Sequence, residues 1–122
     1  MADKNCDKKV ELAESFAIKI IDLEKYLREQ KKERRMSDQI FRSATSIGAN
    51  ISEAKYAEST ADYLHKLSIS QKEANETLYW LRLLFKTGYI DDIKFGALYN
   101  DCQELLRVIT NVILSVRRNQ KK

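Results

Sequence analysis

Three glutamates are the residues of this sequence whose type and spacing best suit acid–base chemistry. Glu53 follows a neutral segment, and Glu73 and Glu76 stand three residues apart, which places them on one face of a helix. Carboxylates in a partly buried layer can have a raised pKa and act as general acids or bases. More often such groups are hydrogen-bonded structural elements. The partners expected for that role are Ser43, Ser46, Asn50 and Lys72. We favour the structural interpretation.

Other signatures of catalysis or metal binding are not met. A di-iron bundle needs two Glu-x-x-His pairs, and His65 is the only histidine, three residues after Asp62. No arginine precedes His65 at the spacing of helical ribonucleases. The sequence also lacks a phosphate-binding glycine loop, a Cys-x-x-Cys pair and a plausible Ser-His-Asp set. We therefore expect a protein that is not an enzyme, with no metal, no cofactor and no small-molecule substrate.

Four helices are predicted to position these residues. Apolar residues recur at helical spacing over residues 7–34, 38–56, 60–87 and 91–118. There is no proline and there are only three glycines, so little interrupts these helices. Ser37 is expected to cap the second helix and Ser59 or Thr60 the third, and Gly88 to end the third. Because the connections are short, the sequence predicts one all-α domain, an up-down-up-down antiparallel four-helix bundle.

Composition sets the expected environment of the protein. One third of the 122 residues are charged, and the net charge is +4. Two cysteines, Cys6 and Cys102, are too few for a disulfide scaffold and are expected to be reduced structural thiols. The first nine residues lack the apolar stretch of a signal peptide, and no apolar run approaches the ~20 residues of a membrane span. We expect a soluble, cytoplasmic protein.

The second predicted helix is unusually small and neutral. Ser43 to Ser52 are ten residues without a charge, and seven of them are Ser, Ala, Thr or Gly. Gly48 in a helix interior costs about 1 kcal/mol relative to Ala, so a packing reason is expected. Either this slim helix is tightly packed among the other helices, or its outer side is covered by another copy of the protein.

The third predicted helix has a second apolar face. Its core stripe is predicted to run from Leu64 to Phe85, and Trp80 lies on the other face. Such a face favours an interface, although a broad helix can also bury these residues at its own flanks. We expect a homo-oligomer. The residues predicted for its interface are Gly48, Ile69, Trp80, Leu83 and Leu84.

Two segments resemble a bacterial family, the four-helix-bundle proteins encoded in intervening sequences of 23S rRNA genes. They are RSATSIGANISEA, residues 42–54, and SISQKEANETLYWLRLLFKTGYI, residues 68–90. The polar residues that carry the resemblance are Arg42, Ser43, Ser46, Asn50, Glu53, Lys72, Glu73 and Glu76. They are accompanied by Ile47, Ile51, Trp80 and Leu81.

The resemblance implies a fold and an assembly. Members of this family form ring-shaped homopentamers. A more distant branch, the accessory variability proteins of diversity-generating retroelements, binds a reverse transcriptase and its RNA template. The present sequence is more similar to the rRNA-insert branch, for which no biochemical activity is established.

Basic residues gather at both ends of the predicted bundle. One group comprises Lys31, Lys32, Arg34, Arg35 and Lys86, and the other comprises Lys8, Lys9, Arg117, Arg118, Lys121 and Lys122. Acidic neighbours are expected to offset part of this charge, Glu29 and Glu33 at the first end and Asp3, Asp7 and Glu11 at the second. Repetition around a ring would raise the local potential. Basic and aromatic residues do not alternate, so binding directed at the nucleic-acid backbone is expected; ordinary solvated helix ends are the alternative.

The sequence therefore predicts a non-catalytic oligomeric interaction scaffold. Its expected partner is RNA or a nucleic-acid enzyme, bound through the basic helix ends. The alternative is an oligomeric protein–protein adaptor that binds no nucleic acid.

Overall fold

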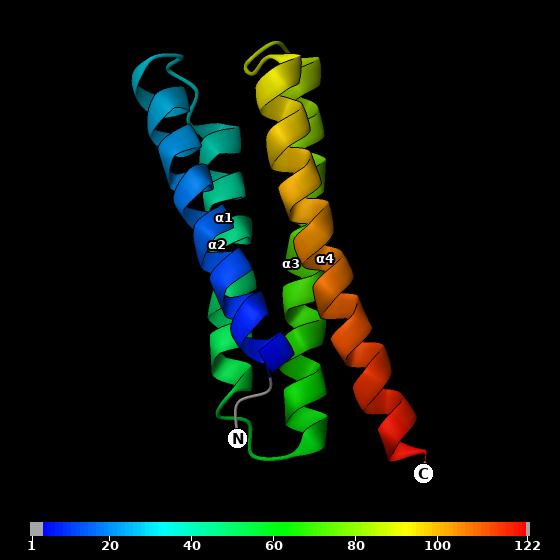
Figure 1. Cartoon of the computed structure of the whole chain (residues 1–122). Helices are drawn as coiled ribbons and strands as arrows, with labels where there is room; N and C mark the ends of the chain where they lie inside the picture. The colour runs from blue at the N-terminus through cyan, green and yellow to red at the C-terminus, as the bar shows by residue number, and fades with distance from the viewer. Residues whose placement is uncertain (1–3, 122) are drawn as a thin grey trace.

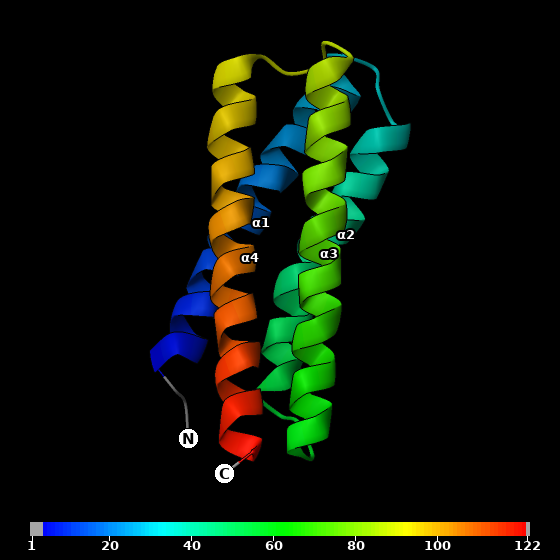
Figure 2. The ribbon, with the colours of Figure 1, turned by 90° about the vertical axis from the view of Figure 1, so that its right-hand side faces the viewer.

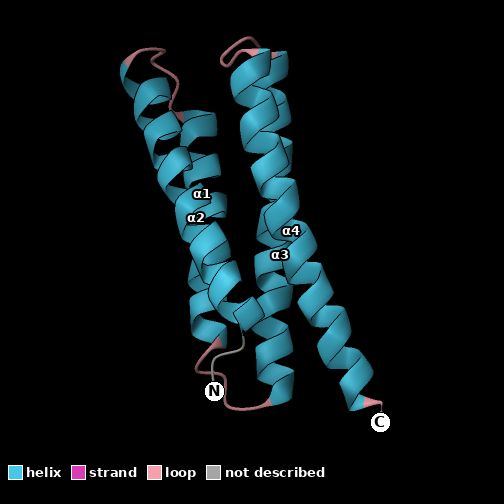
Figure 3. Ribbon diagram, viewed as in Figure 1, coloured by secondary structure: helices cyan, strands magenta, loops and turns pink. Residues whose placement is uncertain are grey.

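The fold is a bundle of four antiparallel helices. The computed structural model describes the backbone of residues 4–121 and the side chains of residues 8–121. The helices are α1 (Lys4–Glu29), α2 (Arg35–Ala54), α3 (Thr60–Lys86) and α4 (Asp92–Gln120), and no strand occurs within the described chain (Figures 1 and 3). The helices pack in sequential pairs, and α1 closes the square against α4. The predicted up-down-up-down bundle is confirmed.

The core is a continuous aliphatic layer between the four helices. Its largest fully buried apolar side chains are Ile20, Leu23, Leu27, Ile40, Ile47, Ile51, Leu67, Leu81, Leu84, Leu105 and Ile109. Burying one such side chain stabilises the fold by about 1.5–3 kcal/mol. The α2–α3 pair makes the most extensive contact and the α1–α4 pair the least, and Figure 1 shows the last turns of α4 leaning away from the bundle. Figure 2 shows α3 and α4 side by side along their length.

Glu33 forms the corner between α1 and α2, which was predicted differently. Its backbone N–H donates to the Leu27 carbonyl at 2.9 Å, and Lys32 adopts a left-handed φ of 56°. The Glu33 carboxylate accepts the backbone N–H groups of Arg35, Met36 and Ser37 at 3.1, 3.2 and 2.9 Å. These are amides that a helix start leaves without a partner inside the helix.

Two expectations for this corner are therefore wrong. The first helix ends at Glu29 rather than near residue 34, because the turn at Lys32 and Glu33 interrupts a run of good helix formers. Ser37 is not an N-cap: it lies fully buried inside α2, and its hydroxyl donates to the Glu33 carbonyl at 2.9 Å.

The predicted boundaries of α3 agree with its observed caps. The Ser59 hydroxyl accepts the Asp62 N–H at 3.0 Å, which makes Ser59 the N-cap. At the other end Gly88 has a φ of +83°, while the N–H groups of Gly88 and Tyr89 donate to Phe85 and Leu84. This hydrogen-bond pattern is a Schellman motif, in which glycine is the favoured residue.

The core stripe of α3 deviates from the predicted one at its end. Phe85 was expected in the core but is 36% exposed, whereas Leu84 was assigned to the outer face and is fully buried. At 3.6 residues per turn a stripe that starts at Leu67 drifts along the helix. Leu81 is then followed by Leu84, three residues on, and not by Phe85. Since its side chain is fully buried within the chain, Leu84 is not available for the predicted interface with a second copy.

Gly48 marks the closest approach of α2 to α1. A Cβ atom at this position would lie 3.3 Å from the Ala13 Cβ, tighter than ordinary van der Waals contact. Ala13 is itself almost completely buried and has no rotamer that could yield. Gly48 was assigned to an interface between copies; the structure gives it a packing role inside the bundle.

Within the described residues, none of the helices combines the length and the apolarity needed to cross a membrane.

We predict that Glu33→Ala lowers the free energy of unfolding by about 1–2 kcal/mol, the usual cost of losing a helix cap. Urea denaturation followed by circular dichroism measures this change. The matched control is Glu29→Ala, one turn earlier and exposed, which should change stability by less than about 0.5 kcal/mol. Equal effects of the two substitutions would contradict the capping role.

A second prediction compares two helical glycines. Gly96→Ala meets open space and should stabilise the protein by up to about 1 kcal/mol through helix propensity. Gly48→Ala should gain less, or destabilise, because the new methyl group presses on Ala13. Thermal unfolding of both variants checks this, and an equal rise in Tm would show that α1 and α2 are not in close contact at Gly48.

Candidate functional site

Hydroxyl groups join α2 to α3 along their buried seam. The Ser43 and Thr77 hydroxyls lie 2.9 Å apart and are both buried. Thr77 Oγ1 has a short bond to the Glu73 carbonyl at 2.8 Å, whereas the Ile40 carbonyl lies 3.4 Å from Ser43 Oγ, so we assign Ser43 as the donor of this pair. The Ser70 hydroxyl, also buried, donates to the Ile47 carbonyl at 2.8 Å. Because these hydroxyl side chains are small, the two helix backbones can approach closely. Each buried hydroxyl still has a hydrogen-bond partner.

Arg42 crosses the outer edge of the same seam. Its Nη2 lies 2.6 Å from Glu76 Oε2, and its Nη1 lies 3.5 Å from Glu73 Oε2. Glu76 Oε2 also accepts the Trp80 indole N–H at 3.1 Å. Glu73 is only 14% exposed, and its Oε2 atom is buried without a hydrogen bond. The arginine therefore supplies the counter-charge for both carboxylates.

The polar motif thus divides into parts with different partners. Arg42, Glu73 and Glu76 meet at the seam, and Ser43 meets Thr77 beneath them. Ser46 and Asn50 bond to carbonyls of their own helix, at 2.7 and 2.8 Å. Glu53 pairs with Lys66 at 3.3 Å.

The carboxylates were expected to bond to Ser43, Ser46, Asn50 or Lys72. The observed partners are Arg42, Lys66 and the Trp80 indole N–H instead. The long guanidinium and ammonium side chains reach across from the neighbouring helix, which the hydroxyl and amide side chains do not.

The outer face of α3 is only partly covered by the chain itself. Ile69, Trp80 and Leu83 are half-buried, and Trp80 is packed against the core beside Tyr79. On the neighbouring side of α2, Phe41 is 41% exposed, and the exposed residues Ala49 and Ser52 carry no charge. The central turns of α2 and α3 therefore leave several apolar and uncharged side chains partly open to solvent beside the ion pairs of Arg42.

Metal binding and thiol chemistry find little support in the described part of the chain. Among the residues searched there, no group of three or more His, Cys, Asp or Glu side chains could hold a metal ion. Burial raises the pKa of the Cys102 thiol to about 12, and its Sγ lies 3.5 Å from the Ala74 carbonyl. Cys102 therefore stays a neutral thiol near pH 7 and is a poor nucleophile. The side chain of Cys6 lies outside the described residues.

The corner between α1 and α2 brings four cations to the surface. We call Lys31, Lys32, Arg34 and Arg35 the basic corner, and all four are exposed. Glu29 and Glu33 were expected to offset them. Glu29 is exposed, but Glu33 is only 9% exposed and its carboxylate is occupied by the amides of α2. Lys86, at the end of α3, lies at the same end of the bundle and is also exposed (Figure 1).

The opposite end of the bundle is less uniformly basic at its surface. Lys8, Arg117, Arg118 and Lys121 are exposed, but Lys9 is fully buried. Lys122 lies outside the described residues. Asp3 and Asp7, expected to offset this end, lie outside the described side chains, and Glu11 is exposed.

One group of residues was missed from the sequence. Tyr26 at the end of α1 and Lys31 in the α1–α2 turn line a hollow together with the α3–α4 loop and Lys94. These residues are far apart along the chain, so no local motif joins them. The predicted antiparallel order does indicate, however, that the end of α1 and the start of α4 lie at the same end of the bundle.

We predict energetic coupling across the α2–α3 seam. Thr77→Val removes the short bond of the buried Ser43 hydroxyl and leaves it only the longer contact to the Ile40 carbonyl at 3.4 Å, which should cost about 1–2 kcal/mol of unfolding free energy. Adding Ser43→Ala removes that hydroxyl, so the double variant should be more stable than the sum of the single changes by at least about 0.5 kcal/mol.

The control for this cycle is Thr45→Val combined with Thr77→Val. The Thr45 hydroxyl bonds only to carbonyls of its own helix, those of Phe41 and Arg42. These two changes should add without coupling. Additivity in the Ser43–Thr77 pair as well, measured by urea denaturation, would contradict a bond between the helices.

Comparison with known proteins agrees with this architecture. The sequence profile described as "23S rRNA-intervening sequence protein" matches residues 8–111. No curated protein matches the chain. A crystal structure of a protein of unknown function from the S23 ribosomal protein family of Bacteroides thetaiotaomicron is 44% identical, with a TM-score of 0.88. The match covers 89% of this chain and 97% of that one. The chain belongs to the 23S rRNA-intervening sequence protein family.

Proposed function

We propose that this protein is a non-catalytic oligomeric scaffold that binds RNA through its basic corner. The observation that carries the proposal is the position of Glu33. Its carboxylate is buried against the first amides of α2, so the anion in the middle of the run does not project among the four cations. Four basic side chains within five successive residues then face water together.

Clustered cations of this kind suit a phosphate backbone. At physiological ionic strength, exposed charges separated by more than about 8 Å are largely screened. The four cations of the basic corner are close neighbours on one turn, so they can act together on the same stretch of backbone. Each phosphate that a cation neutralises releases condensed counterions, which drives binding without regard to sequence. The names of the family and of its solved relative refer to ribosomal RNA and to a ribosomal protein, which is compatible with an RNA partner and assigns no activity.

Assembly of several copies would strengthen this binding. The open α2–α3 face offers Trp80, Leu83 and Ile69 beside a neutral stretch of α2, and solvent-facing helices normally carry charge there. A second copy on this face would bury those apolar groups. The resemblance implies a homopentamer, and in such a ring several basic corners would engage one RNA with increased avidity.

RNA binding is tested by fluorescence anisotropy of a labelled RNA across a series of salt concentrations. The wild type should bind at micromolar concentration or below, and binding should weaken steeply with salt. The variant Lys32→Gln/Arg34→Gln/Arg35→Gln removes three phosphate contacts, so the slope of log Kd against log salt should fall by about 2.

The matched control is Lys25→Gln/Lys72→Gln/Arg107→Gln, which removes three exposed cations elsewhere on the surface. It should bind nearly as the wild type does. Equal weakening of both triple variants would show that only the total charge matters. Absence of binding at low salt would refute the proposed function.

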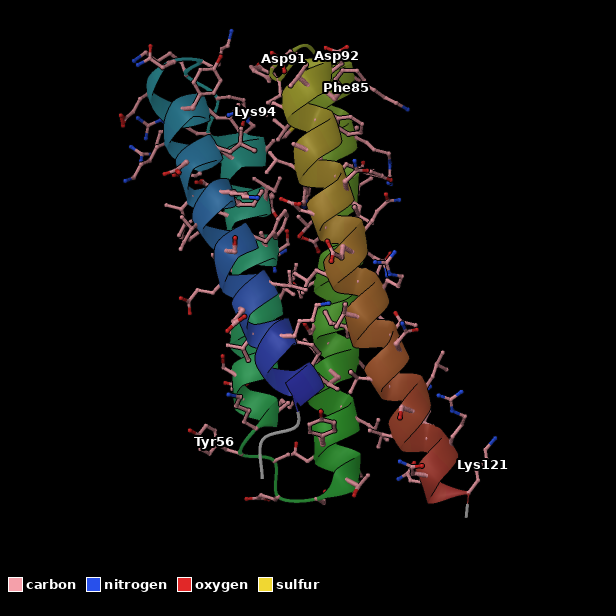
Figure 4. The ribbon with its side chains drawn as sticks, in the orientation of Figure 1. Tyr56, Phe85, Asp91, Asp92, Lys94 and Lys121 are labelled. Atoms are coloured by element: carbon pink, nitrogen blue, oxygen red, sulfur yellow. The ribbon has the colours of Figure 1, made fainter. Side chains whose placement is uncertain are left out.

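A protein partner is the second candidate, because two large side chains project far from the bundle. Tyr56 is 86% exposed in the α2–α3 turn and Ile93 is 81% exposed at the start of α4; Figure 4 shows Tyr56 pointing away from the ribbon. Exposed apolar side chains of this size are frequent anchors in protein interfaces. This adaptor function, including docking onto a nucleic-acid enzyme, gains support if RNA does not bind.

A further inference from the structure

Two loops face each other across a hollow at the end of the bundle that carries the basic corner. The hollow has a volume of about 420 Å³. Tyr26 lines it from the end of α1 and Lys31 from the α1–α2 turn. Residues 88–91 line it from the α3–α4 loop, and Lys94 lines it from the first turn of α4. Its size is within the range of small-molecule sites, which span roughly 300–1,000 Å³.

The hollow combines open aromatic surface with positive charge. The Tyr26 side chain is 40% exposed, and Lys31 Nζ lies 5.9 Å from the centre of its ring. The Lys31 ammonium thus lies over one face of the ring, and a base that stacks on that face takes its place while the ammonium turns to the phosphate. Tyr89 supplies a second phenol at the border of the hollow. Figure 4 shows Lys94 on the side of α4 that faces the α1–α2 pair.

The acidic groups beside the hollow restrict how an anion can lie there. The Asp91 carboxylate accepts the Lys94 amide at 2.8 Å and so caps α4. Asp91 and Asp92 are both exposed, so a phosphate chain that continued over the start of α4 would be repelled. A chain that leaves past Lys31 instead meets the rest of the basic corner, at Lys32, Arg34 and Arg35.

We propose that this hollow takes one unstacked nucleotide of a single-stranded RNA, an inference that rests on the proposed RNA binding and refines it. The base stacks on the Tyr26 ring, and the phosphate lies between the ammonium groups of Lys31 and Lys94. The strand then continues onto the basic corner. Bases in a duplex are already stacked and cannot enter, so the hollow selects single-stranded RNA over double-stranded RNA.

The test compares Tyr26 variants on a short single-stranded RNA and on a duplex of the same length. Tyr26→Leu should weaken single-strand binding about tenfold, the usual effect of losing one base–aromatic stack, with an unchanged salt slope. Tyr26→Phe keeps the ring and should bind as the wild type does. Lys94→Gln should instead lower the salt slope by about 0.7, the value for one phosphate of a single strand.

Tyr79 provides a matched control. It is 46% exposed and has Arg82 at 5.9 Å from its ring centre, but it does not line the hollow. Tyr79→Leu should leave binding unchanged, and the duplex should be insensitive to Tyr26→Leu. A fluorescent adenine analogue in the single strand should change its emission on binding to the wild type but not to Tyr26→Leu.

The outcomes separate this proposal from the one on which it rests. If the wild type binds RNA and loses affinity in the corner variant, while Tyr26→Leu binds as tightly as the wild type, the hollow is refuted and the RNA scaffold stands. Equal losses for Tyr26→Leu and Tyr79→Leu would also refute the hollow. If no RNA binds and an acidic peptide binds in a Tyr26-dependent manner, both proposals are overturned and the hollow belongs to a protein interface.

Discussion

The close packing of α2 against α3 is the constraint on which the rest of the structure depends. The two helices meet through Ser43, Ser70 and Thr77, whose buried hydroxyls are all hydrogen-bonded. Larger apolar side chains would push the helices apart, and small side chains without hydroxyls would lose these bonds between and within the helices. With α3 on one side and α1 at Gly48 on the other, α2 has little room for bulk. The small side chains at Ser43 and Gly48 follow from that position.

The ends of the bundle are organised by a different interaction, the capping of α2 by Glu33. This carboxylate is enclosed by the backbone amides that it satisfies, so the turn that starts α2 also separates an anion from its cationic neighbours. The exposed basic corner is thus a consequence of how the chain reverses direction. At the same end, the Schellman turn at Gly88 brings the α3–α4 loop opposite Tyr26 and Lys31, and the hollow lies between them.

The sequence was sufficient to predict the four helices, their antiparallel order and an N-cap of α3 at Ser59 or Thr60. Periodicity carries that information because each helix buries one continuous stripe. Periodicity did not predict the role of Glu33, because its side chain caps a helix that begins later in the chain. It did not predict the burial of Leu84 either, because the point at which the buried stripe of α3 shifts by one residue depends on tertiary packing. Arg42 was placed in the polar motif, but its pairing with Glu73 and Glu76 required the two helices to be placed side by side. The Tyr26 hollow joins residues from two loops and therefore has no local pattern.

We propose that copies of this chain assemble through the α2–α3 face, so that their basic corners act together on one RNA. Sedimentation velocity of the purified protein at micromolar concentration tests this assembly most directly, because a single corner of four cations contacts few phosphates and would bind RNA only weakly. Our account predicts a species several times the 14.2 kDa of one chain, five times for the ring that the resemblance implies. It also predicts that Trp80→Ala shifts this species toward the monomer. A wild-type protein that sediments as a 14.2 kDa monomer would contradict the account.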